Sequence, residues 1–151
     1  MRIVRIIAPA LLALLAVPAA ADPIAAHDEQ ESIRETGRQE IARILAADNV
    51  DASRLSTRQV ATAIRAIPRG AAPDDFWTAY QAHVRAWERA ADAEERAMNM
   101  VGAKPAEMEG AIAAFVAAQA EIAATFEQVR QIATGYGVEM PIPPAEAANT
   151  V

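Results

Sequence analysis

The chain has 151 residues, with 14 basic and 20 acidic side chains and no cysteine, and its formal net charge at neutral pH is −6. The lack of cysteine excludes disulfide bonds, cysteine-ligated zinc, c-type haem attachment and a lipidated cysteine at a leader-cleavage site. The acidic balance argues against binding to nucleic acid or to an anionic membrane surface, since both attract basic proteins.

The first twenty-one residues have the pattern of a cleaved export signal. Arg2 and Arg5 form a positive start, an apolar core follows, and Ala19–Ala21 provide small residues for cleavage before Asp22. The apolar core is too short for a membrane span of ~20 residues. We therefore predict a periplasmic or secreted protein that begins at Asp22 and has no stable membrane anchor. Loss of two of the 14 basic residues with the signal brings its net charge to −8.

The remainder is rich in Ala, Glu, Arg and Gln and has no run of alternating β-branched residues, which predicts an all-α protein. We expect one domain over 22–140 and a proline-rich, extended or disordered tail over 141–151. The expected fold is an antiparallel helical bundle with two long helices covered by two shorter ones. The long helices are expected at about 74–101 and 105–134, and the short ones at about 28–47 and 56–67.

The first short helix has a polar beginning, so we expect that end to project or fray. Its apolar side is formed by Ile33, Ile41, Ile44 and Leu45. Asp48-Asn49 is expected to end it, because Asn tolerates the left-handed conformation.

The second short helix has the clearest start signal. Ser56 and Gln59 form a capping box, and Leu55 is placed to pack on Val60 as a hydrophobic staple. Pro68 follows its last apolar residue and ends it.

The two long helices carry apolar residues at steps of three or four and are joined by a short turn at Gly102, so we expect them to pack as a hairpin. The short helices would cover its open side. Mirroring the chain about Ala103 places Tyr80 opposite Phe126. It also places Trp87 opposite Ala118 or Gln119, as a core residue.

Glu94 interrupts the apolar stripe of the first long helix. A buried carboxylate needs a partner, which Arg43 or Arg65 would supply from the covering helices. Alternatively, those helices do not extend that far and Glu94 stays in water.

One segment concentrates ring-bearing side chains and gives the only candidate binding site. Phe76, Tyr80, His83 and Trp87 would line a small pocket with convergent polar groups. The alternative is that the aromatic rings simply pack the core, with His83 at its polar edge.

We expect no metal and no cofactor. The positions three residues before His27 and His83 are Ile24 and Tyr80, not the Glu of a di-iron bundle. Haem ligation by His83 and a methionine is disfavoured because the nearest methionines along the hairpin, beginning at Met98, lie about four helical turns away. No HExxH, GxSxG, GxxxxGK or GxGxxG motif is present, which argues against an enzyme.

Two strings of the chain carry a resemblance. They are Pro73-x-Asp75-Phe76-x-x-Ala79-Tyr80-x-x-His83-x-x-Ala86-Trp87 and Thr125-Phe126-x-x-Val129-x-x-Ile132-Ala133-x-x-Tyr136-Gly137. With the helix start at Leu55, these strings resemble short exported bacterial proteins of unknown function, over about half of the mature chain. The resemblance implies a single domain and brings no activity, ligand or partner.

These observations leave two classes of function open. The first is a non-enzymatic periplasmic protein that binds a protein partner, in an accessory or envelope-stress role. The alternative is a small-ligand or haem carrier that uses the aromatic segment around His83.

Overall fold

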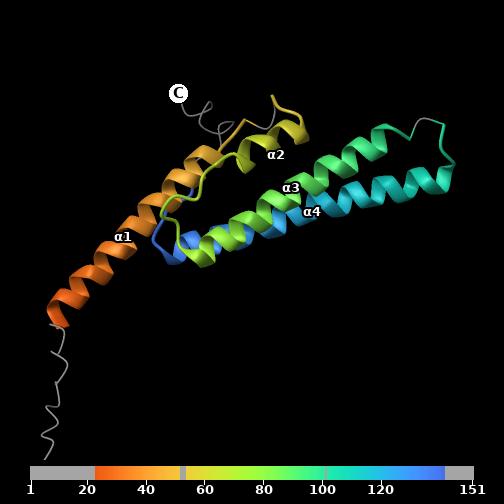
Figure 1. Ribbon diagram of the computed structural model, residues 1–151. Helices are drawn as coiled ribbons and strands as arrows, with labels where there is room; N and C mark the ends of the chain where they lie inside the picture. Colours follow the sequence, from red (N-terminus) through yellow and green to blue (C-terminus); the bar gives the residue numbers. More distant parts are fainter. Residues whose placement is uncertain (1–22, 52–53, 101, 142–151) are drawn as a thin grey trace, which may run out of the picture.

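The computed structural model describes residues 23–51, 54–100 and 102–141, and it is all-helical over these residues. The predicted signal lies outside the described residues, as does the tail from 142 onward. The expected all-α bundle is confirmed, with a long antiparallel hairpin as its main element (Figure 1). The helices are α1 (Pro23–Asp48), α2 (Thr57–Arg65), α3 (Asp74–Met98) and α4 (Pro105–Gly135).

Local signals explain most helix ends. The capping box of α2 is confirmed: the Gln59 N–H donates to Ser56 Oγ at 3.2 Å, and the Ser56 N–H donates to Gln59 Oε1 at 2.9 Å. Leu55, the expected staple, remains 37% exposed. α1 does end at Asp48, but the expected left-handed Asn49 is wrong, because no described non-glycine residue has a positive φ.

Glycines shape the two ends of the hairpin. α3 ends at Met98, earlier than the expected 101, and the connector to α4 contains Gly102 at φ 87°. α4 closes on Gly137 at φ 75°, with the Val138 N–H donating to the Ala133 carbonyl at 3.0 Å. This 6→1 bond is the Schellman pattern, which a left-handed glycine permits.

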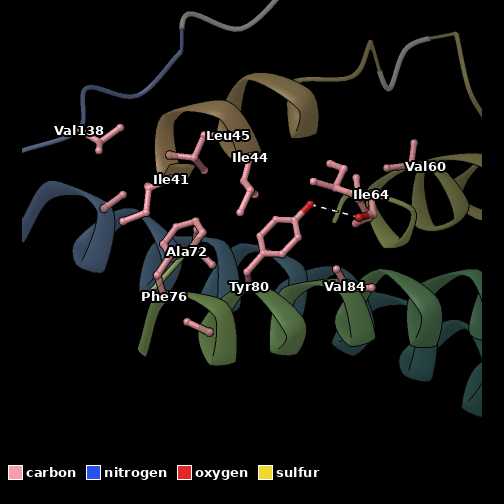
Figure 2. Close-up of a cluster of buried hydrophobic side chains, with 14 residues drawn as sticks. Ile41, Ile44, Leu45, Val60, Ile64, Ala72, Phe76, Tyr80, Val84 and Val138 are labelled. Carbon is pink, nitrogen blue, oxygen red and sulfur yellow. Dashed lines mark hydrogen bonds between the residues drawn. The ribbon is translucent and has the colours of Figure 1, made fainter. Parts of the chain in front are cut away.

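The main core lies at one end of the hairpin, where all four helices meet, with Val129 and Ala133 contributed by α4 (Figure 2). The second half of α1, the buried side of α2 and the first half of α3 enclose Phe76 and Tyr80, both 0% exposed. The largest aliphatic side chains around them are Ile41, Ile44, Leu45, Val60 and Ile64.

α1 joins the core only by its second half, and its first half extends away from the other helices, as its polar sequence predicts (Figure 1). At the junction, a Cβ on Gly37 would lie 3.0 Å from Cγ of Pro73. α1 therefore crosses the α2–α3 connector closely.

The contact between α3 and α4 differs from the expected one. Small side chains on α3 face the partner helix at steps of four and three, and only His83 is large among them. These residues are Ala79, His83, Ala86, Ala90 and Ala93, all buried. Alanine allows the closest approach of two helices, so the alanine stripe of α3 faces α4. The expected aromatic stripe, with Trp87, lies beside this contact on the neighbouring side of α3.

The register of the hairpin is also shifted. His83 contacts Thr125 and Arg89 pairs with Glu121, two and four positions beyond the partners expected from a mirror about Ala103. Tyr80 is therefore not opposite Phe126; the ring of Phe126 lies 5.3 Å from that of His83. The two contacts are centred at residues 104 and 105 of the chain, so the observed register differs from the mirror about Ala103 by two to four positions.

The short helices do not cover Glu94, which is the second of the two alternatives expected for this residue. α2 lies along α3 only as far as Asp92 and Glu95, which accept from Arg58. Neither predicted partner reaches Glu94: Arg43 pairs with Glu40, and Arg65 pairs with Glu88. The alternative expectation, in which Glu94 stays in contact with water, agrees with its partial exposure.

Candidate functional site

A cavity of about 580 Å³ lies where the end of α1, α2, the hairpin and the segment after α4 come together. Most of the residues that line the cavity are apolar, and a smaller number are polar. The apolar lining residues are Leu45, Val50, Ile64, Trp87, Ile122, Ala123, Phe126, Met140 and Pro141, and the polar ones are Asp48, Asn49, His83, Gln119 and Arg130. This volume lies in the range of small-molecule sites.

His83 forms the floor of the cavity and is held by two hydrogen bonds. The Trp87 indole N–H donates to His83 Nε2 at 3.1 Å, and Nδ1 lies 3.1 Å from Thr125 Oγ1. Indole can only donate, so Nε2 is the acceptor and the neutral ring carries its proton on Nδ1. The Thr125 hydroxyl in turn donates to the Glu121 carbonyl at 2.8 Å.

Burial, rather than the hydrogen bonds, keeps the imidazole neutral. Burial lowers the pKa of His83 to about 4, well below its ordinary value of 6.5. Protonation would place a proton on Nε2, directly against the Trp87 N–H. Both ring nitrogens are thus engaged within the protein, and neither is directed as a free ligand into the cavity.

A second polar pair consists of Asp48, which lines the cavity, and Tyr80, which is completely buried and does not line it. The Tyr80 hydroxyl lies 3.1 Å from Asp48 Oδ1 and 3.3 Å from the Ile64 carbonyl. Burial raises the pKa of Asp48 to about 6, although the hydrogen bond from Tyr80 opposes the shift. Burial and the neighbouring carboxylate raise the pKa of Tyr80, which therefore stays protonated and donates.

The four residues proposed from the sequence are divided between the core and the cavity. His83 and Trp87 line the cavity, whereas Phe76 and Tyr80 are completely buried behind it. Phe76 and Tyr80 stack on each other with ring centroids 6.1 Å apart. Trp87 is only partly buried and packs against the edge of the core, so its expected role as a core residue is only partly correct.

Several lining residues were missed by sequence reasoning. Phe126 was expected only opposite Tyr80 in the hairpin, and Asp48 only at a helix end, yet both line the cavity. Arg130, at the rim, is held by Glu127 through two hydrogen bonds of 2.7 and 2.6 Å. The sequence carries no signal for these roles, because the cavity combines residues far apart in the chain.

The other hollows are less suited to a ligand. One of about 660 Å³ follows charged side chains on the first half of α1, and one of about 440 Å³ lies at the hairpin tip beside Ala93 and Ala114. Across the described ranges, no group of three or more His, Cys, Asp or Glu side chains is arranged to hold a metal ion. By length and composition alone, α4 is the one described helix that could cross a membrane.

The fold and the cavity define an all-α helical-bundle protein with a preformed apolar pocket. No protein-family model, no curated protein and no solved structure matches the chain. The resemblance to short exported bacterial proteins therefore stays an expectation.

Proposed function

We propose that this chain is an exported, non-enzymatic binding protein that holds a small apolar ligand in the cavity above His83. The observation that supports this function best is the cavity itself, about 580 Å³ in volume and lined mainly by aliphatic and aromatic side chains. An apolar ligand of matching size would remove this lining from water, and each buried CH₂ group contributes about 0.8 kcal/mol.

The polar network of the site argues for an organic ligand over haem. A haem iron would need a lone pair of His83, but Nε2 accepts from Trp87 and Nδ1 bears the proton shared with Thr125. Axial ligation would break one of these bonds in a buried setting. We therefore favour a neutral, apolar small molecule, with Gln119 and Asn49 as polar groups at its edge.

The ligand site can be tested by filling it with a large side chain. Ala123 and Ala124 are both exposed, but only Ala123 lines the cavity. Ala123→Trp should weaken binding of the neutral dye Nile red at least tenfold, about 1.4 kcal/mol. Ala124→Trp adds the same surface elsewhere and should bind like the original protein. Equal binding by all three proteins, measured by fluorescence titration, would contradict the proposal.

Export has its own test. We expect periplasmic extracts to yield a soluble chain that begins at Asp22. The basic start, the short apolar core and the three alanines together form an export signal, which is removed by cleavage after Ala21. Intact-mass spectrometry measures this directly. A chain that retains Met1 and sediments with membranes would show that the first segment is an anchor.

A protein partner is the second candidate function. It is supported by large apolar side chains that the described helices leave uncovered at the far end of the hairpin. Those with the greatest exposure are Met98 at 72%, Val116 at 60%, Ile112 at 52% and Met108 at 42%.

A further inference from the structure

The far end of the hairpin leaves large apolar side chains of α3 and α4 exposed, namely Met98, Met108, Ile112 and Val116. Trp87 on α3 and Gln119 on α4 line the cavity, and steps of three or four from them lead outward along the same side of the hairpin. On α3 these steps reach Ala91, Glu94 and Met98, and on α4 they reach Phe115, Ile112 and Met108. We call Met98, Met108, Ile112 and Phe115, with Val116 at their edge, the distal apolar face.

Glu94 gives this face its charge preference. It stands among apolar side chains, is partly exposed, and makes no hydrogen bond or ion pair with any residue that the structure describes. The other acids on the neighbouring turns of α3 are already used, since Asp92 and Glu95 pair with Arg58 and Glu88 pairs with Arg65. A partner that covers the face must place a cation near Glu94, because a carboxylate buried without one is strongly disfavoured.

The chain itself shows what kind of element fits here. α2 covers the neighbouring part of α3 as a short amphipathic helix, with Val60 and Ile64 buried. Its two charged side chains, Arg58 and Arg65, are both basic and both reach acids of α3. A helix of the same kind, with an apolar stripe flanked by a basic side chain, would cover the hairpin from the first turn of α2, at Arg58, to the hairpin tip.

We propose that the distal apolar face binds a basic amphipathic helix of a partner polypeptide, with a cationic side chain of that helix paired to Glu94. This inference rests on the second candidate function and does not depend on the ligand cavity. A second copy of the chain is a poorer occupant, because the chain is acidic overall, with 20 acidic and 14 basic side chains. A lipid surface is also poorer, since Glu94 would enter it with the apolar side chains.

The probe is an 18-residue synthetic helix with leucines on one face and arginines along both flanks, titrated by calorimetry into the full-length mature protein. We expect binding that weakens at least ~tenfold in Ile112→Asp and ~three- to fivefold in Glu94→Gln. Glu31→Gln removes the same charge from the exposed start of α1 and should leave binding unchanged. A peptide with glutamate in place of arginine should bind at least ~tenfold more weakly.

The controls separate this inference from the cavity proposal. Ala123→Trp should leave peptide binding intact, and Ile112→Asp, at an exposed position, should leave Nile red binding and melting temperature intact. Equal weakening by Glu94→Gln and Glu31→Gln would overturn the inference by showing general charge attraction. Failure of the peptide to bind would also overturn the inference. A dimer that Ile112→Asp dissociates in ultracentrifugation would instead assign the face to a second copy of the chain. Binding to phosphatidylglycerol vesicles that Ile112→Asp abolishes would assign it to a lipid surface.

Discussion

Replacing Tyr80 by alanine should lower the free energy of unfolding by ~3–5 kcal/mol, enough to unfold a marginal domain of this size. Tyr80 is 0% exposed and stacks with Phe76 and Trp77 at the centre of the main core. The truncation would open a cavity and also leave the half-buried Asp48 without its hydroxyl donor. Urea denaturation followed by circular dichroism measures the loss.

Trp87 is the informative comparison for Tyr80. A core position for Trp87 in the hairpin seam, as expected from the sequence, would give Trp87→Ala the same ~3–5 kcal/mol effect. In the structure Trp87 lies at the cavity wall and is only partly buried, so about 1–2 kcal/mol is expected. Equal losses for Tyr80→Ala and Trp87→Ala would contradict this distinction between core and cavity wall.

A second large effect concerns pH, because the two buried titratable groups of the cavity act in opposite directions. The pKa of His83 is about 4 in the folded protein, against an ordinary 6.5, so the unfolded chain binds the extra proton between these values. Its contribution to stability is complete above pH 6.5 and is lost as the pH falls. From pH 6.5 to 5 this loss is about 1.5 kcal/mol.

Asp48 has the reverse effect over nearly the same range. Its folded pKa of about 6 exceeds the ordinary 3.8, so the folded protein binds the proton first, and stability is gained as the pH falls. From pH 6.5 to 5 the gain is about 1 kcal/mol. The two contributions oppose each other, so we expect the stability of the unchanged protein to vary less between these pH values than that of a variant lacking either group.

Single substitutions should reveal the hidden pH dependence. Asp48→Asn retains an acceptor for Tyr80 and should lose stability on acidification from pH 6.5 to 5. His83→Gln should lose about 1 kcal/mol at neutral pH through an imperfect hydrogen bond and should then gain stability as the pH falls. Denaturation of both variants at a series of pH values measures the slopes. Parallel pH profiles for the two variants would refute the assignment.

The amino-acid sequence by itself determined the helical class, the hairpin and the start of α2. These depend on neighbouring residues: the capping box of Ser56 and Gln59, the 3–4 spacing of apolar residues, and the short connector at Gly102. Such signals act within one or two helical turns. They can therefore be recognised without knowing what packs against the helix.

Only the tertiary structure decided which face of α3 meets α4, how far the cover extends and where the cavity lies. The aromatic stripe and the alanine stripe of α3 are adjacent and both fit helical spacing, so periodicity could not choose between them. The choice depends on how closely two backbones approach, and Ala86 and Ala90 permit the closer contact. This long-range packing also brings His83 into contact with Thr125, 42 positions away, and Asp48 into contact with Tyr80, 32 positions away.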